Sequence, residues 1–176
     1  MSAGTTSAEA YETVRQLVAA KCCIGHKDFF GGSVLHHACI NDDARPEVIR
    51  VLIGAAADVN YQQEPSTFAY RSLLKVARLA VHAGSKSALL QAMASWQGWT
   101  PLMPAAQSGQ VDVVRELIAA KADPSIRNRQ GHTAYDLTRL SFGEGVPASL
   151  KNLLITPDNA SYCDVALHVT SGSLEP

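Results

Sequence analysis

The sequence predicts an all-α fold built from stacked helical hairpins, and three observations support this prediction. Residues 98–123 read as a turn, a short helix, a loop and a longer helix. The pattern that opens this unit at Gly98 returns at Gly131, 33 residues later, and a related pattern opens at Gly31. Because one such hairpin cannot bury its own apolar face, neighbouring copies must stack to form a continuous core.

The best-formed copy begins at Gly98, which permits a tight turn. Thr100 can cap the short helix, and Pro101 suits the first helical position. Gly109 ends this helix, and apolar residues then recur at helical spacing, namely at Val113, Val114, Leu117 and Ile118. The unit is therefore a turn followed by two antiparallel helices.

The flanking copies follow the same plan. Helices are expected at 33–42 and 46–55 in the copy that opens at Gly31, and at 133–141 and 147–155 in the last copy. Residues 14–21 resemble residues 114–121, so the chain begins with half a unit, a helix at about 8–21. This first helix should cap one end of the stack.

The unit resembles the ankyrin repeat, on the residues Gly98-Trp99-Thr100-Pro101-Leu102 and the end Ala122-Asp123. The resemblance covers roughly residues 8 to 155 and is strongest for 31–60 and 98–138. It implies an ankyrin-repeat solenoid of three to four repeats with short β-turn fingers. Within a domain of residues 1–155, the expected parts are an N-terminal cap at 8–30, repeats at 31–60 and 98–130, and a C-terminal cap repeat at 131–155.

Residues 61–97 depart from the family pattern because they contain no Gly-x-Thr-Pro-Leu core. They still predict two helices, at about 67–83 and 86–95. The segment is either a degenerate repeat or a helical insertion in a finger, and its length, close to one period, favours the repeat. The tail, 156–176, leaves the helical period, and residues 162–170 alternate as a strand would.

Composition restricts the classes of function. The 176 residues are 47% hydrophobic with a net charge of −1, so the chain is neither disordered nor strongly attracted to nucleic acid. No apolar run approaches the ~20 residues that a membrane helix needs, and the first ten residues carry no signal peptide. We expect a cytoplasmic monomer, with the nucleus as the alternative, reduced cysteines and no cofactor, nucleic-acid or membrane partner.

The resemblance also implies a non-catalytic module that binds a partner protein, which the sequence does not identify. In ankyrin proteins the finger tips and the inner face of each first helix hold the partner. The corresponding positions here are Lys27, Phe29, Phe30, Ile40, Asn41, Trp96, Gln97, Trp99, Gln107, Ser108, Arg127, Arg129, Gln130 and His132. Aromatic and arginine side chains supply much of the binding energy at interfaces, although these aromatics could instead pack between fingers.

A basic stripe is a second candidate surface. Arg71, Lys75, Arg78 and His82 recur at helical spacing, opposite a face that carries Leu73, Leu74, Val76, Ala77 and Ala80. No Asp or Glu occurs between Glu64 and Asp112. The stripe would suit an acidic partner or a phosphate, and the alternative is a solvated outer face.

Three further functions have candidate residues, each with a structural alternative. Cysteine and histidine residues gather at 22–39, namely Cys22, Cys23, His26, His36, His37 and Cys39, but their spacing fits zinc poorly. Cys39 with His36 or His37, or Asp136 with His132, could form a nucleophile and base, yet no oxyanion hole or phosphate loop accompanies them. The repeat end at Asn60 resembles a hydroxylase substrate, and a structural hydrogen bond is the alternative role.

Overall fold

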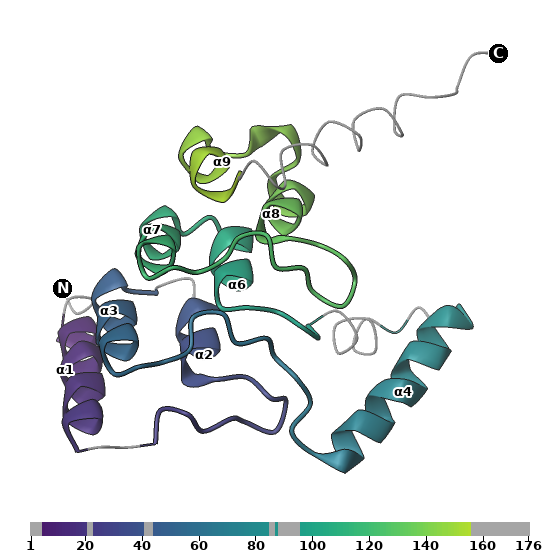
Figure 1. Ribbon diagram of the computed structural model, residues 1–176, viewed down its shortest axis with the longest axis horizontal. Coiled ribbons are helices and arrows are strands. Elements are labelled where there is room, and N and C mark those ends of the chain that lie inside the picture. The colour runs from purple at the N-terminus through teal and green to yellow at the C-terminus, as the bar shows by residue number, and fades with distance from the viewer. Residues whose placement is uncertain (1–4, 21–22, 41–43, 85–86, 88–95, 156–176) are drawn as a thin grey trace.

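The computed structural model describes residues 5–20, 23–40, 44–84, 87 and 96–155, and nearly all regular structure in these ranges is helical (Figure 1). The α-helices are α1 (Thr5–Ala19), α2 (Val34–Ile40), α3 (Pro46–Gly54), α4 (Phe68–His82), α6 (Leu102–Gln107), α7 (Val111–Ala119), α8 (Ala134–Phe142) and α9 (Ala148–Leu154). A 3₁₀ turn, η1 (Gly143–Gly145), joins the last two, and Lys27 forms an isolated β-bridge with Ser33. None of the described helices is long and apolar enough to cross a membrane.

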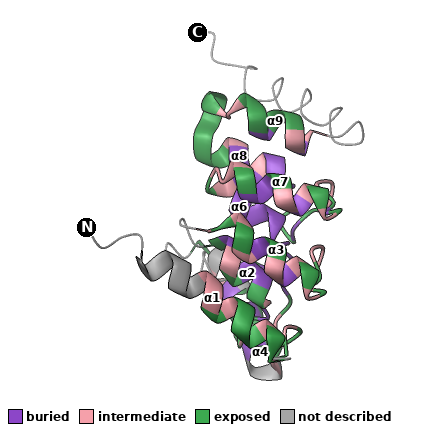
Figure 2. Cartoon of the chain, turned by 90° about the vertical axis from the view of Figure 1, so that its left-hand side faces the viewer, coloured by how far each residue is buried: buried purple, intermediate pink, exposed green. Residues whose placement is uncertain are grey.

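Two layers of helices form an elongated stack. The first helix of each hairpin contacts the next, in the order α2, α6 and α8, and the second helices do the same, in the order α1, α3, α7 and α9. The core lies between the layers, where Leu35, Ile49, Leu102, Leu117 and Leu150 are almost completely buried (Figure 2). The predicted all-α solenoid is confirmed, and α1 lies beside α3 at one end of it.

The two central hairpins pack directly on each other, because α2 contacts α6 and α3 contacts α7. Gln63 N donates to Trp99 O at 2.7 Å, and Gly98 N donates to Gln63 O at 2.8 Å, so the chain on either side of residues 64–97 closes into one finger. Helix α4 lies apart from the stack (Figure 1). This arrangement agrees with a helical insertion in a finger, the alternative that segment length did not favour, and we call residues 64–97 the insertion. The choice between the two alternatives stays a prediction.

Three equivalent turns begin the hairpins. Gly31, Gly98 and Gly131 have φ angles of 83°, 74° and 86°, a left-handed conformation that glycine adopts without a steric penalty. The expected cap at Thr100 does not form, since α6 begins at Leu102 without a side-chain cap bond. At the next turn, Thr133 and Asp136 form a complete capping box. The helix predicted at 86–95 falls almost entirely outside the described residues, as does the strand predicted at 162–170.

Candidate functional site

A small hollow opens on the inner face of the stack, where the ends of α2 and α6 meet the second finger. Its volume is about 90 Å³ and we call it the inner hollow; its lining residues are His36, Ile40, Gln63, Trp96, Trp99, Pro104, Gln107 and Ser108. Five of them, Ile40, Trp96, Trp99, Gln107 and Ser108, belong to the predicted partner-binding set. The structure therefore brings together positions that lie far apart in the sequence.

Two apolar side chains stand exposed at this hollow. Ile40, the last residue of α2, is 45% exposed, and Trp96, beside the root of the insertion, is 47% exposed. Gln107 ends α6, and Ser108 follows it on the surface. An apolar surface with polar neighbours is the usual composition of a protein-binding site.

The floor of the inner hollow is held by His36. Its Nε2 atom donates to Trp99 O at 2.8 Å, and its Nδ1 atom lies 2.8 Å from Ser33 Oγ, which donates to it. Burial lowers the pKa of His36 below its ordinary value of 6.5, so the ring is neutral at pH 7. Because the Trp99 carbonyl belongs to the next repeat, this imidazole ties two repeats together beneath the hollow.

Two predicted contact residues are mostly buried and expose only a small part of their surface. Trp99 is only 7% exposed and belongs to the hydrophobic core, while Gln97 is also 7% exposed. The two residues flank Gly98, and the backbone of Gln63 forms hydrogen bonds with Gly98 and Trp99 at this turn. Trp99 therefore contributes mainly packing to the stack, and of the two tryptophans Trp96 exposes the larger surface.

Sequence reasoning missed Leu140. Ile40, Gln107 and Leu140 occupy the same position in successive hairpins, 67 and then 33 residues apart, as do the glycines that open them. Leu140 is 69% exposed on α8 and extends the row that begins at Ile40. The 33-residue period, applied to Gln107, was the signal that could have found it.

Side chains of the first finger, two phenylalanines and a lysine, pack against aromatic rings of the segment that follows the first full repeat. Phe29 and Phe30 lie 5.2 Å and 5.4 Å from the Tyr70 ring of α4, measured between ring centroids. Lys27 Nζ lies 3.9 Å above the ring of Tyr61, within cation–π distance. Both phenylalanines keep a large exposed surface. They therefore fasten the insertion to the finger and remain accessible.

The third finger presents most of the remaining predicted residues. Arg127, Arg129 and Gln130 are exposed, and His132 is half-buried. The backbone of the finger is fixed by Asn128, whose Oδ1 accepts from Gln130 N and His132 N at 2.9 Å each. Arg129 Nη2 pairs with Glu64 Oε1 at 2.9 Å and so links this finger to the insertion. Asn41 lies outside the described residues.

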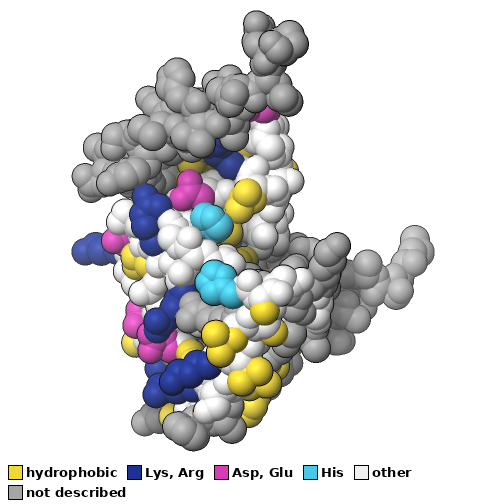
Figure 3. Space-filling model, turned by 90° about the vertical axis from the view of Figure 1, so that its right-hand side faces the viewer, with side chains coloured by type: hydrophobic (Ala, Val, Ile, Leu, Met, Phe, Trp, Pro, Cys, Tyr) yellow, Lys and Arg dark blue, Asp and Glu magenta, His cyan; other side chains and the backbone are white. Residues whose placement is uncertain are grey.

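The basic stripe of α4 is partly visible. Arg71, Lys75 and His82 are exposed, whereas the side chain of Arg78 lies outside the described part of the chain. The apolar face was only partly predicted. Tyr70, Leu74 and Ala77 are buried, but Leu73, Val76 and Leu79 are exposed. Figure 3 shows Lys and Arg side chains gathered beside an exposed hydrophobic patch on this side of the molecule.

The residues considered for metal or catalytic chemistry have other partners. In the ranges that the structure describes, which exclude Cys22, no three His, Cys, Asp or Glu side chains are grouped as a metal site. Burial raises the pKa of Cys39 to about 12, which disfavours the nucleophilic thiolate. His37 Nε2 lies 2.9 Å from Asp28 Oδ2, and Asp136 caps α8 through Thr133. None of these contacts forms a nucleophile–base pair.

Asn60 has a structural role. Its Nδ2 donates to Lys121 O at 3.1 Å, and its Oδ1 accepts from Asp123 N at 2.8 Å. Both amide atoms thus join the ends of the two adjacent repeats. These bonds are the role expected of an asparagine at this position.

Comparison with known proteins places this geometry in context. A model of the ankyrin repeat family matches residues 30–63 and 97–129. The chain is 29% identical over 135 residues to the tyrosine-protein kinase Shark of Drosophila melanogaster, covering 74% of this chain and 14% of the relative. It is 34% identical over 87 residues to the espin-like protein of Homo sapiens, covering 46% of this chain and 9% of the relative. The chain thus spans a small part of both relatives.

Proposed function

The chain carries ankyrin repeats and belongs to that family, and on this basis we propose that it is a non-catalytic module that binds a partner protein at the inner hollow and the finger tips. Ankyrin repeats are generally protein-interaction modules. The proposal includes a cytoplasmic location, with the nucleus as the alternative, and a monomeric state.

One observation carries the proposal: two large apolar side chains, Trp96 and Ile40, are exposed at a hollow whose floor is tied to the next repeat by a hydrogen bond of His36. An apolar side chain of the partner would bury both against the floor formed by His36 and Trp99. Tryptophan is among the residues most enriched at interface hot spots, whose truncation costs at least ~2 kcal/mol of binding free energy. Because the hydrogen bond from His36 to the next repeat already fixes the floor, little conformational entropy is lost when the partner binds.

The surrounding surface completes the site as a polar rim. Gln107 and Ser108 offer hydrogen-bonding groups beside the hollow, and Arg127, Arg129 and Gln130 are exposed on the third finger. Such groups orient a partner and exclude water around the apolar centre, but each contributes little binding energy by itself. The double substitution of Trp96 and Ile40 should therefore weaken binding more than any single rim substitution.

The test compares the variant Trp96→Ala/Ile40→Ala with wild type. Proteins captured by the immobilised wild-type chain are identified, and the affinity of each purified candidate is measured by titration calorimetry. We expect the double variant to bind at least ~30-fold more weakly, the equivalent of ~2 kcal/mol. Leu17→Ala, which removes an equally exposed leucine from α1 in the other layer, is the matched control and should bind as wild type does.

Circular dichroism shows whether weaker binding by the double variant comes from the lost side chains or from unfolding. Both side chains are about half exposed, so the double variant should keep the helical spectrum of wild type. Unchanged affinity in a folded double variant would contradict the proposal. A variant that unfolds would show that Trp96 is needed for the stack, and would contradict its assignment to the surface.

The same binding function would also suit a segment of a longer protein. The chain covers 14% and 9% of its two relatives, one of them named as a tyrosine-protein kinase. If this chain is likewise a segment of a larger regulatory protein or enzyme, the inner hollow would recruit a substrate or regulator to it. A longer transcript that encodes these residues would favour this setting.

A further inference from the structure

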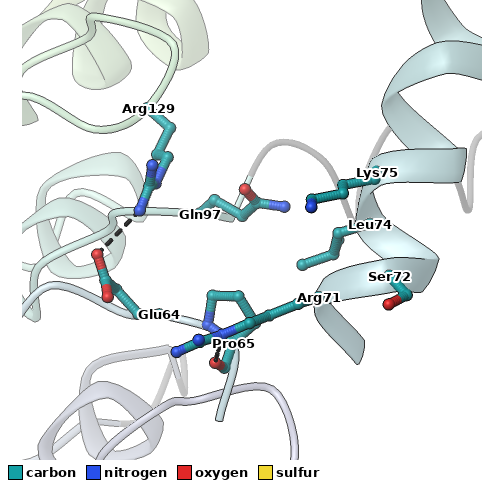
Figure 4. Close-up of a pocket in the computed structure, with 8 residues that line it drawn as sticks. All are labelled: Glu64, Pro65, Arg71, Ser72, Leu74, Lys75, Gln97 and Arg129. Atoms are coloured by element: carbon teal, nitrogen blue, oxygen red, sulfur yellow. Dashed lines mark hydrogen bonds and ion pairs between the residues drawn. The ribbon is translucent and has the colours of Figure 1, made fainter. Parts of the chain in front are cut away.

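A cleft separates α4 from the second and third fingers. Its volume is about 500 Å³, and none of its lining residues belongs to the hollow. Figure 4 shows side chains from α4, from the start of the insertion and from the third finger around this space, namely Glu64, Pro65, Arg71, Ser72, Leu74, Lys75, Gln97 and Arg129. We call it the insertion cleft.

The charges around the insertion cleft are unbalanced. Three cationic side chains line it, Arg71, Lys75 and Arg129, against one carboxylate, Glu64. Glu64 is already paired with Arg129 at 2.9 Å, and Arg71 Nε donates to the Pro65 carbonyl at 3.0 Å. Among the described residues, neither Arg71 nor Lys75 has an acidic partner. Two positive charges therefore remain at the cleft without a counter-charge.

A buried donor points into the same space. The Nε2 atom of Gln97 has no acceptor among the described residues, although the side chain is more than nine-tenths buried. Its backbone is held in place because Gln97 O accepts from Arg129 N at 3.0 Å. In Figure 4 the amide reaches toward α4, from which Lys75 extends toward it. An acceptor placed between these two hydrogen-bond donors would satisfy both.

Beyond Glu64, the segment that forms one side of the cleft carries basic residues and no acidic ones. Residues 65–111 contain no Asp or Glu, and segment 65–97 carries four Lys or Arg residues. The whole chain has a net charge of −1, so the remainder carries −5. This concentration of positive charge on the insertion would attract an acidic segment of a partner specifically to this part of the molecule.

We propose that the insertion cleft binds a carboxylate side chain, Asp or Glu, from an acidic segment of the partner protein. The carboxylate accepts hydrogen bonds from Lys75 and Gln97 and lies beside the guanidinium of Arg71. Leu74 and Pro65 form the apolar part of the lining, and Leu73 and Val76 are exposed on the same helix. The segment therefore carries an apolar residue next to its acidic one. This inference rests on the proposed function and names the chemistry of the partner.

The test uses a fluorescein-labelled synthetic decapeptide that contains four glutamates and two leucines. Its binding to the full chain is followed by fluorescence anisotropy, beside a matched peptide with glutamine in place of every glutamate. The glutamate peptide should bind more tightly, and its affinity should fall as salt rises. Lys75→Glu should weaken its binding about tenfold, because a charge that attracts the carboxylate becomes one that repels it. Lys75→Arg should restore most of the affinity.

Matched controls separate a site from a general charge effect. Lys151→Glu makes the same charge reversal on the exposed face of α9, outside the cleft, and should leave binding unchanged. Gln97→Glu should weaken binding as Lys75→Glu does, because it replaces the amide donor by a second carboxylate. Equal binding of the two peptides, or equal effects of Lys75→Glu and Lys151→Glu, would overturn the proposal. So would binding restricted to a peptide in which phosphoserine replaces glutamate.

The two proposals fail in different ways. A natural partner whose binding depends on Trp96 but not on Lys75 would overturn the carboxylate site and leave the proposed function standing. A glutamate peptide that binds at Lys75, with no partner whose binding depends on Trp96 and Ile40, would support the cleft and contradict the inner hollow.

Discussion

Substituting Gly31 by alanine should destabilise the stack more than the same change at an equivalent glycine. Gly31 has a φ angle of 83°, and an added Cβ atom would lie 1.6 Å from the carbonyl oxygen of Glu64 and 2.5 Å from its carbon. The left-handed backbone costs an alanine ~1–2 kcal/mol. Moving the Glu64 backbone away from the new methyl group adds ~1–3 kcal/mol. The expected loss in the free energy of unfolding is therefore ~2–5 kcal/mol for Gly31→Ala.

Gly131→Ala is the matched control. Its φ angle is 86°, nearly that of Gly31, but an added Cβ would have no heavy atom within 4 Å. It should lose only the backbone contribution of ~1–2 kcal/mol. Urea unfolding followed by far-ultraviolet circular dichroism measures both variants against wild type. Equal losses in the two variants would refute the reasoning, because the close approach of Glu64 to the first finger would then be of no consequence.

Two further predictions concern His36 and the capping residue Thr133. The free energy of unfolding should fall as the pH drops below 6.5, because burial holds the pKa of His36 in the folded chain below that value and the unfolded chain takes up the proton first. The urea midpoint of wild type should therefore be lower at pH 5.5 than at pH 7.5, and this difference should be smaller in His36→Asn. Thr133→Ala should lose about 1 kcal/mol in a urea titration, because the capping box at the start of α8 is removed, and Thr133→Ser should retain most of it.

The repeated hairpins could be predicted because their signals are local. A glycine at each turn and apolar residues at helical spacing located α2, α3, α6 and α7 close to their observed bounds. The capping box at Thr133 was open to the same reasoning, since a Thr followed by an acidic residue three positions later is visible in the sequence. Such signals depend only on neighbouring residues, so no knowledge of the tertiary fold is needed.

The insertion could not be placed in the same way. A length close to one repeat favours a degenerate repeat, whereas the contacts that bear on this choice lie between Gln63 and Trp99, and between hairpins that are remote in sequence. The same limit explains the tryptophans. Trp96 and Trp99 lie on either side of the turn at Gly98, and only the pairing of the finger with Gln63 determines which ring enters the core.

The two candidate surfaces share a structural origin. The chain leaves the stack at Glu64 and returns at Trp96 and Gln97; Trp96 borders the inner hollow, while Glu64 and Gln97 line the insertion cleft. The backbone hydrogen bond between Gln63 and Gly98 closes this shared root. A partner that contacts both surfaces would present an apolar side chain to the one and a carboxylate to the other. An ankyrin stack without the insertion would keep the ends of α2 and α6 but would lack the cleft altogether, so the insertion is the feature that would give this chain its own specificity.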